Sequence, residues 1–114
     1  MAPPTITLDS EYQITVAWNS PTDLGGLTVS YLLEVKTSSN TFEKDLDDCD
    51  AENDSAIIEA RSCSFQVDQT LRENPFNLAD LEPVIARVTA INDIGSSVVS
   101  DISDSGVNMP IADV

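Results

Sequence analysis

The two cysteines, Cys49 and Cys63, are the residues with the most readily predicted chemistry, because they are the only cysteines in the chain. An even number of cysteines in a small domain is typical of a disulfide formed in an oxidising compartment. A Cys49–Cys63 bond would close a loop of about 15 residues and so restrict the unfolded chain. The alternative is two free thiols, with Cys63 buried on a strand. A zinc site is excluded, because two cysteines without any histidine supply too few ligands.

The segment between the cysteines is crowded with carboxylates, which are ligands that Ca²⁺ prefers. Its spacing approaches that of a calcium-binding loop, but Asn53 stands where such loops have a glycine, and no flanking helices are expected. Like charges this close together more often form a solvated surface, so calcium binding and a plain acidic surface are alternative interpretations. The candidate calcium ligands are Asp48, Asp50, Glu52, Asp54 and Glu59.

Asn53 also begins the tripeptide Asn-Asp-Ser, the acceptor motif for N-linked glycosylation in proteins secreted by eukaryotic cells. The motif lies in the same polar segment, where we expect an exposed loop. Such short motifs also arise by chance, so this one permits a sugar at Asn53 without requiring it.

The net charge of the chain is −15, from 20 acidic and 5 basic residues. This charge repels phosphate groups, so neither nucleic acids nor anionic membranes are expected partners. No apolar run approaches the roughly 18 residues that span a membrane. The chain has no histidine and no glycine-rich phosphate loop, which removes the commonest general base and the commonest phosphate cradle. We therefore expect no enzyme activity and no cofactor apart from the Ca²⁺ considered above.

The elements that position these residues are predicted to be strands, because apolar and polar residues alternate along much of the chain. In residues 12–18, for example, Tyr12, Ile14, Val16 and Trp18 share one face. No amphipathic helix longer than one turn is expected. About seven short strands, each with one apolar face, predict an all-β fold in which two antiparallel sheets form a sandwich. The expected strands are residues 5–9, 12–18, 27–36, 41–45, 63–67, 84–90 and 97–102.

Several of these positions resemble the pattern of the fibronectin type III domain, an immunoglobulin-like sandwich. A strand ends in Trp18, Pro21 follows, and the next strand carries Tyr31-x-Leu33-x-Val35. The stretch Ala86-Arg-Val-Thr-Ala-Ile-Asn92, followed by Gly95, Ser97 and Ser100, fits the same pattern. The resemblance implies sheets of three and four strands with Trp18 in the core between them. The two cysteines make the chain resemble a disulfide-containing variant found as repeats in large surface proteins. Most members of the family are modules of adhesion, receptor and matrix proteins, so the resemblance implies a similar role.

The chain departs from the family pattern at the start of the sixth strand, where Val84 or Ile85 replaces an expected tyrosine. The hydroxyl of that tyrosine usually ties the corner of the sandwich to the backbone, so another contact must replace it. Phe42 and Phe76 are the only aromatic rings expected outside the core, which argues against a carbohydrate-binding platform.

Some apolar residues of the expected strands fall on the face that points away from the core. The resemblance places the strands that carry Leu32, Ile85 and Ile91 side by side in the three-stranded sheet, where they join Val98 or Val99. An exposed apolar patch of this kind often marks a contact surface. The alternative is scattered aliphatic residues that merely favour strand formation. The candidate interface residues are Leu32, Ile85, Ile91, Val98 and Val99.

We divide the chain into a linker at residues 1–4, a domain at residues 5–108, and a linker or tail at residues 109–114. The first residues lack the basic and apolar regions of a signal peptide, so we expect none there, and Ala-Pro-Pro is typical of a linker within a longer chain. The predicted function is a non-catalytic protein-interaction or spacer module of an extracellular or cell-surface protein. It would contact a protein partner or neighbouring domains of the same chain. The alternatives are a self-assembling subunit of an extracellular fibre and a calcium-dependent binding domain.

Overall fold

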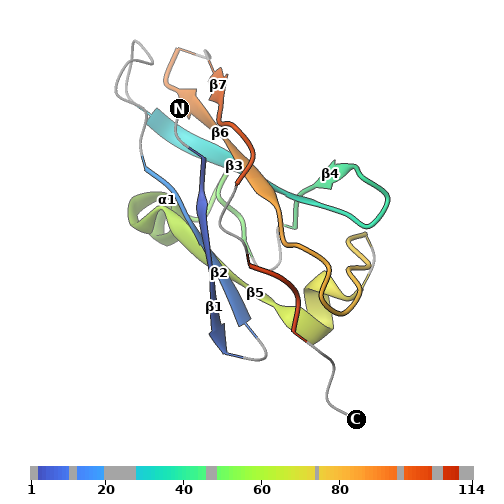
Figure 1. Ribbon diagram of the computed structural model, residues 1–114. Helices are drawn as coiled ribbons and strands as arrows, with labels where there is room; N and C mark the ends of the chain where they lie inside the picture. Colours follow the sequence, from blue (N-terminus) through green and yellow to red (C-terminus); the bar gives the residue numbers. More distant parts are fainter. Residues whose placement is uncertain are drawn as a thin grey trace.

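The computed structural model describes residues 3–10, 13–19, 28–45, 49–73, 75–94, 97–103 and 107–110. Within these residues, seven strands form two antiparallel sheets that pack face to face (Figure 1). The three-stranded sheet has the order β1 (Thr5–Ser10), β2 (Gln13–Ala17) and β5 (Ser62–Gln66). The four-stranded sheet has the order β4 (Phe42–Glu43), β3 (Thr28–Lys36), β6 (Ala86–Asn92) and β7 (Ser97–Val99). The predicted two-sheet sandwich is confirmed.

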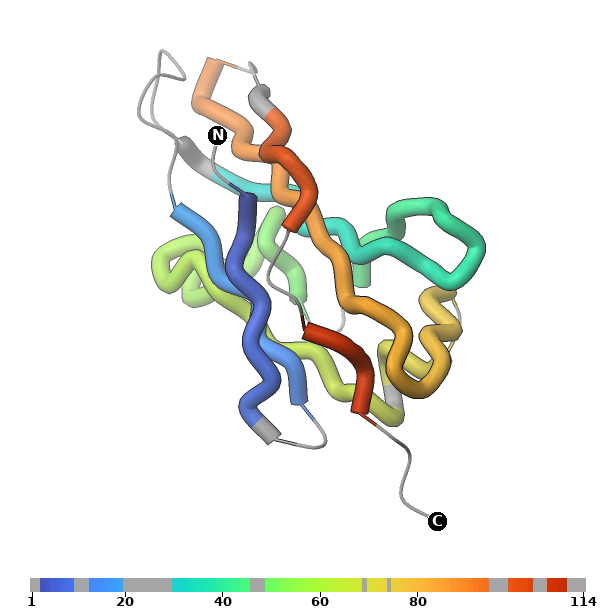
Figure 2. The backbone as a smooth tube through the Cα atoms, in the orientation of Figure 1, coloured from blue at the N-terminus to red at the C-terminus, as the bar shows by residue number. Residues whose placement is uncertain are grey.

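The core lies between the sheets and follows the alternation seen in the sequence. Every second residue of β2, of β6 and of residues 30–36 in β3 is buried. Figure 2 shows β2 of one sheet across the core from β3 and β6, which are neighbours in the other sheet. Trp18 is 5% exposed and meets Tyr31 edge to face, with 5.3 Å between the ring centroids. Both rings were expected in the core, and both are there. Tyr12, which was expected to join them, lies outside the described residues.

The expectation that Phe76 is a spare surface ring is wrong, because its side chain is completely buried. After β5, a five-residue π-helical segment, η1 (Val67–Leu71), turns the chain back toward the core. The main-chain N–H of Leu78 then bonds to the carbonyl of Leu71 at 2.8 Å, which folds the segment over the end of the sandwich. Phe76 thereby packs against Phe65, with 6.4 Å between the ring centroids.

The expectation of no helix longer than a turn is also wrong, because the loop after Cys49 contains α1 (Ser55–Ala60). Asp54 caps the start of this helix by accepting a hydrogen bond from the N–H of Ala56 at 3.0 Å. Arg61 ends it in the left-handed conformation, with φ of 53°. Ile57 and Ile58 pack against the core, which supplies the tertiary contact that so short a helix needs. No helix in the described ranges is long and apolar enough to cross a membrane.

The corner before β6 is tied by the C-terminal segment in place of the missing tyrosine. The N–H of Val84 bonds to the carbonyl of Val107 at 2.9 Å, and that of Leu81 bonds to Met109 at 3.0 Å. Met109 is completely buried, although the sequence assigned it to a tail. Arg72 adds a second tie, because its guanidinium donates to the carbonyl of Pro110 at 2.6 Å and pairs with two aspartates.

Two serines complete the edge of β6 beyond the short strand β7. The N–H of Ala86 donates to the hydroxyl of Ser103 at 2.9 Å, and the N–H of Val88 donates to the hydroxyl of Ser100 at 3.0 Å. In return, the N–H of Ser103 donates to the carbonyl of Ala86 and the N–H of Ser100 donates to the carbonyl of Val88, each at 2.8 Å. The two serine hydroxyls therefore accept hydrogen bonds from the main chain of β6 beyond the point where its pairing with β7 ends.

Candidate interaction face and disulfide loop

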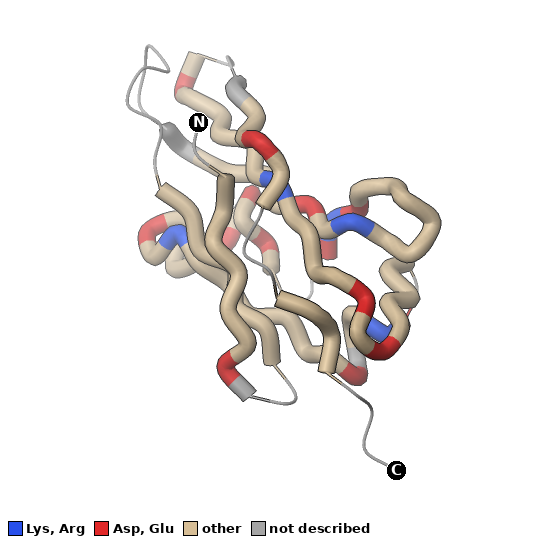
Figure 3. Tube along the Cα trace, viewed as in Figure 1, with Lys and Arg blue, Asp and Glu red and all other residues tan. Residues whose placement is uncertain are grey.

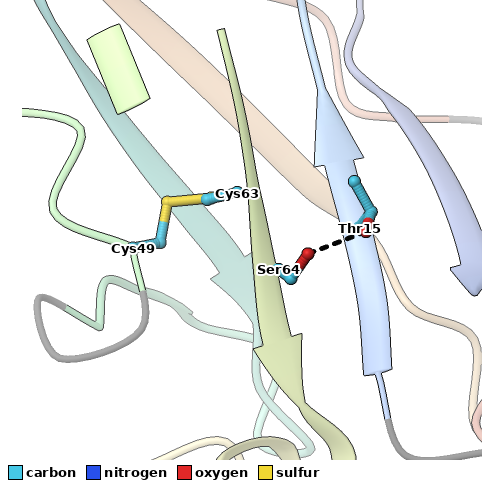
Figure 4. Close-up of a disulfide and its surroundings, with 4 residues drawn as sticks. All are labelled: Thr15, Cys49, Cys63 and Ser64. Atoms are coloured by element: carbon cyan, nitrogen blue, oxygen red, sulfur yellow. Dashed lines mark hydrogen bonds between the residues drawn. A yellow bond between two sulfur atoms is a disulfide. The ribbon is translucent and has the colours of Figure 1, made fainter. Parts of the chain in front are cut away.

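A disulfide joins Cys49 and Cys63, with 5.6 Å between their Cα atoms, and the described residues include no free cysteine (Figure 4). Cys63 lies in β5, and its side chain points into the core while that of Ser64 points to the other side of the strand toward Thr15. Cys49 lies two residues before Ala51, whose carbonyl accepts a hydrogen bond from the N–H of Tyr31 in β3 at 3.0 Å. The disulfide therefore links β5 of one sheet to a loop that is hydrogen-bonded to β3 of the other, and the prediction of this bond is supported.

The carboxylates proposed as calcium ligands mostly have donors from the protein itself. Glu52 pairs with Lys44 at 3.0 Å, Asp54 caps α1, and Asp50 accepts from the N–H of Asn53 at 3.1 Å. Glu59 is exposed on α1, and Asp48 lies outside the described residues. No group of three or more metal-ligating side chains gathers anywhere in the part of the chain that the structure describes. Calcium binding stays a prediction, without added support from this geometry.

Three of the candidate interface residues, Leu32, Ile91 and Val99, lie on the outward side of the four-stranded sheet, which we call the outer face. Leu32 pairs with Thr89 and Thr89 with Val99, so these three side chains form a row across β3, β6 and β7. Ile91 occupies the next outward position of β6, and Ile85 lies beside Lys36, just before that strand. The assignment of these strands to the three-stranded sheet is wrong, because alternation along a strand does not reveal which strands pair.

The degree of exposure differs among the residues of the outer face. Leu32, Ile85 and Ile91 are half-buried, whereas Val99 is 52% exposed. Val99 is paired with Thr89, an outward position of β6, whereas the side chain of Val98 lies outside what the structure describes. Of the pair Val98 and Val99, the register therefore places Val99 on the outer face.

An aromatic and charged cluster, which the sequence reasoning missed, borders this apolar row. The guanidinium of Arg87 lies over the ring of Phe42, with 4.2 Å from its carbon to the ring centroid. The same guanidinium bonds to Glu34 at 3.0 Å on the neighbouring strand. Arg87 and Glu34 are directly paired across β6 and β3, and Phe42 is paired with Lys36. A cross-strand register would have been needed to find this cluster, and the sequence alone does not supply one.

Charge is distributed unevenly over the two sheets and their loops. Among the described strands, acidic residues occur only at Asp9, Glu34 and Glu43, and Figure 3 shows the other described acidic residues in the loops and helical segments outside the strands. The outward side of the three-stranded sheet is polar, with the hydroxyl of Thr15 bonded to Ser64 at 2.9 Å and to Asp9. The outer face carries Lys36 and the neutralised pair of Glu34 and Arg87. The outer face thus combines apolar, hydroxyl and charged side chains, and the charged ones named here carry no net negative charge on a strongly acidic protein.

Two antiparallel sheets of three and four strands, joined by a disulfide around one aromatic core, define a β-sandwich module. The fold is that of a fibronectin type III domain, as the sequence resemblance implied. The chain is similar to the sixth fibronectin type III domain of human fibronectin type III domain containing protein 3, with a TM-score of 0.57 and 18% identity. That similarity covers 99% of this chain and 86% of the solved one. No protein-family profile and no curated protein matches the chain.

Proposed function

We propose that this chain is a non-catalytic protein-interaction module of a larger extracellular or cell-surface protein, and that the outer face is its contact surface. The observation that carries the proposal is the row of Leu32, Thr89 and Val99 together with Ile91 on one sheet face. Apolar side chains grouped on one exposed face favour association, because covering them releases water from apolar surface.

The charges of the chain support the choice of this face. A protein of net charge −15 repels another acidic surface at most approaches. On the outer face the carboxylate of Glu34 is already paired with Arg87, and Lys36 adds a positive charge. A protein partner with an apolar centre therefore meets no unpaired carboxylate among these residues. Arg87, held between Phe42 and Glu34, presents a planar and ordered group at the border of the contact.

The disulfide supports an extracellular setting, because such bonds persist in oxidising compartments. A non-catalytic role agrees with the fold, which commonly serves as an interaction or spacer module. It also agrees with the composition, since the chain has no histidine and the carboxylates between the cysteines are solvated or bonded to protein donors. A spacer role in the same protein is compatible with the shape, whose principal extents are 49 × 23 × 22 Å.

The proposal is tested by placing a photo-crosslinking amino acid at Val99 in the protein from its native source. A matched probe at Thr7 reports on the polar outward side of the three-stranded sheet. We expect a crosslinked product from position 99 that is lost when Ile91→Glu is added and kept when Thr15→Glu is added. Equal crosslinking from both positions, or none from position 99, would contradict the proposal. The mass of the product distinguishes a different protein from a second copy of this chain.

A further inference from the structure

The tripeptide Asn53-Asp54-Ser55 is the single Asn-x-Ser/Thr motif without proline in the 114 residues. Other asparagines are followed two positions later by residues that do not fit the motif, as in Asn19-Ser-Pro and Asn40-Thr-Phe. The motif matters chemically because the side-chain hydroxyl at its third position is needed for transfer of a sugar to the asparagine amide.

The structure leaves all three residues of this motif exposed. Asn53 lies in the turn that leads into α1, and its main-chain N–H donates to the carboxylate of Asp50 at 3.1 Å. Its side-chain amide lies 3.4 Å from the same oxygen, at the weak end of hydrogen bonding. Asp54 holds the turn by capping α1. The amide of Asn53 is therefore at the surface, and a sugar attached there displaces no core side chain.

The same loop contains the disulfide, and this is the second observation that bears on the motif. Cys49 and Cys63 enclose Asn53, and a disulfide of this kind forms in secretory compartments of eukaryotic cells. The loop also adjoins β5, which is an edge strand of the three-stranded sheet. An exposed edge can pair with another chain, and a bulky polar group beside it would hinder such pairing.

We propose that Asn53 is an N-glycosylation site that accepts an oligosaccharide when the chain passes through a eukaryotic secretory pathway. The donor is a lipid diphosphate-linked oligosaccharide. A bond forms between the side-chain amide nitrogen of Asn53 and the anomeric carbon of the first sugar. The bond between that carbon and the diphosphate oxygen breaks, the lipid diphosphate leaves, and one amide proton passes to a base of the transferase. This inference rests on the extracellular setting proposed above.

The test directs the disulfide-bonded chain through the secretory pathway of a cultured eukaryotic cell, so that its outcome does not depend on the native compartment. Intact mass is measured before and after treatment with a peptide N-glycosidase. We expect a mass excess that the enzyme removes, with Asn53 converted to aspartate in the released peptide. The excess should vanish in Asn53→Gln and in Ser55→Ala. It should persist in Ser55→Thr, which keeps the hydroxyl, and in the control Asn19→Gln, which alters an exposed asparagine outside the motif.

Two results would overturn the proposal. One is secreted, disulfide-bonded wild-type protein whose Asn53 peptide carries no sugar. The other is an enzyme-sensitive mass excess that remains in Asn53→Gln. Because removal of sugar is read by mass and not by folding, a destabilised variant still gives an interpretable result. If the probe at Val99 gives no crosslink in the otherwise wild-type protein while Asn53 carries a sugar, the proposed interaction face is refuted and the glycosylation site is not.

Discussion

Ser103→Ala removes the hydroxyl that accepts a hydrogen bond from the buried N–H of Ala86, where oxygen and nitrogen are 2.9 Å apart. Ser103 is 5% exposed and Ala86 is completely buried, so bulk water does not reach this donor. A buried donor that loses its partner costs about 1–3 kcal/mol. The alanine retains the β-carbon and leaves the main-chain bond from Ser103 to Ala86 in place. We therefore expect the free energy of unfolding to fall by roughly 1–3 kcal/mol.

Ser100→Ala has the same consequence for the N–H of Val88, whose bond to the hydroxyl is 3.0 Å long. The double variant is expected to lose roughly 2–6 kcal/mol, a large part of the 5–15 kcal/mol typical of a whole domain. Unfolding in urea is followed by the fluorescence of Trp18, the single tryptophan of the chain, which lies in the core. The slope against urea should not change, because the folded and unfolded states expose the same surface as before.

The matched control is Ser64→Ala, which removes an exposed hydroxyl that bonds to Thr15. Its free energy of unfolding should stay within about 0.5 kcal/mol of the wild type. If Ser103→Ala unfolds at the same urea concentration as Ser64→Ala, the serine hydroxyls do not serve as acceptors for β6. The account of this edge would then be wrong.

Three further predictions concern the core, the corner and the disulfide. Phe76→Ala should cost about 3–5 kcal/mol in urea unfolding, because the ring is completely buried, whereas Ile94→Ala, at a 73% exposed position, should cost less than about 0.5 kcal/mol. Similar costs for the two would place Phe76 outside the core. Arg72→Met keeps the apolar stem but removes the bonds to Asp68, Asp80 and Pro110. We expect the free energy of unfolding to fall by roughly 1–3 kcal/mol and hydrogen exchange at Met109 to become faster. Unchanged exchange at Met109 would show that Arg72 does not hold the C-terminal segment in place. Removing the disulfide with Cys49→Ala and Cys63→Ala should lower the free energy of unfolding by about 3 kcal/mol and raise hydrogen exchange in α1 more than in β6. An equal increase in both elements would contradict a local stabilising effect of the disulfide.

The sequence predicted the sandwich well, because each strand carries its own signal. The buried side of a strand repeats at every second residue, and Tyr31, Leu33 and Val35 show this without reference to any other strand. The pairing of strands is different, since it depends on contacts between distant segments. That is why the outward positions Leu32 and Ile91 were identified while their sheet was assigned incorrectly.

The parts that the sequence did not predict depend on single residues and on tertiary contacts. The helix α1 has only six residues, and it is formed because Asp54 and Arg61 cap its ends while Ile57 and Ile58 reach the core. Phe76 lies in an irregular segment between Pro75 and Asn77, where no periodicity marks it as buried. The cluster of Phe42, Arg87 and Glu34 spans three strands, so its members are far apart in the chain.

The most direct test of the account as a whole is the state of the two cysteines in the protein isolated from its native source. Intact mass is measured after alkylation of free thiols, with and without prior reduction. A disulfide-linked extracellular module predicts that Cys49 and Cys63 resist alkylation until they are reduced. Alkylation of both without reductant, in protein that is still folded, would contradict the disulfide and the extracellular setting together.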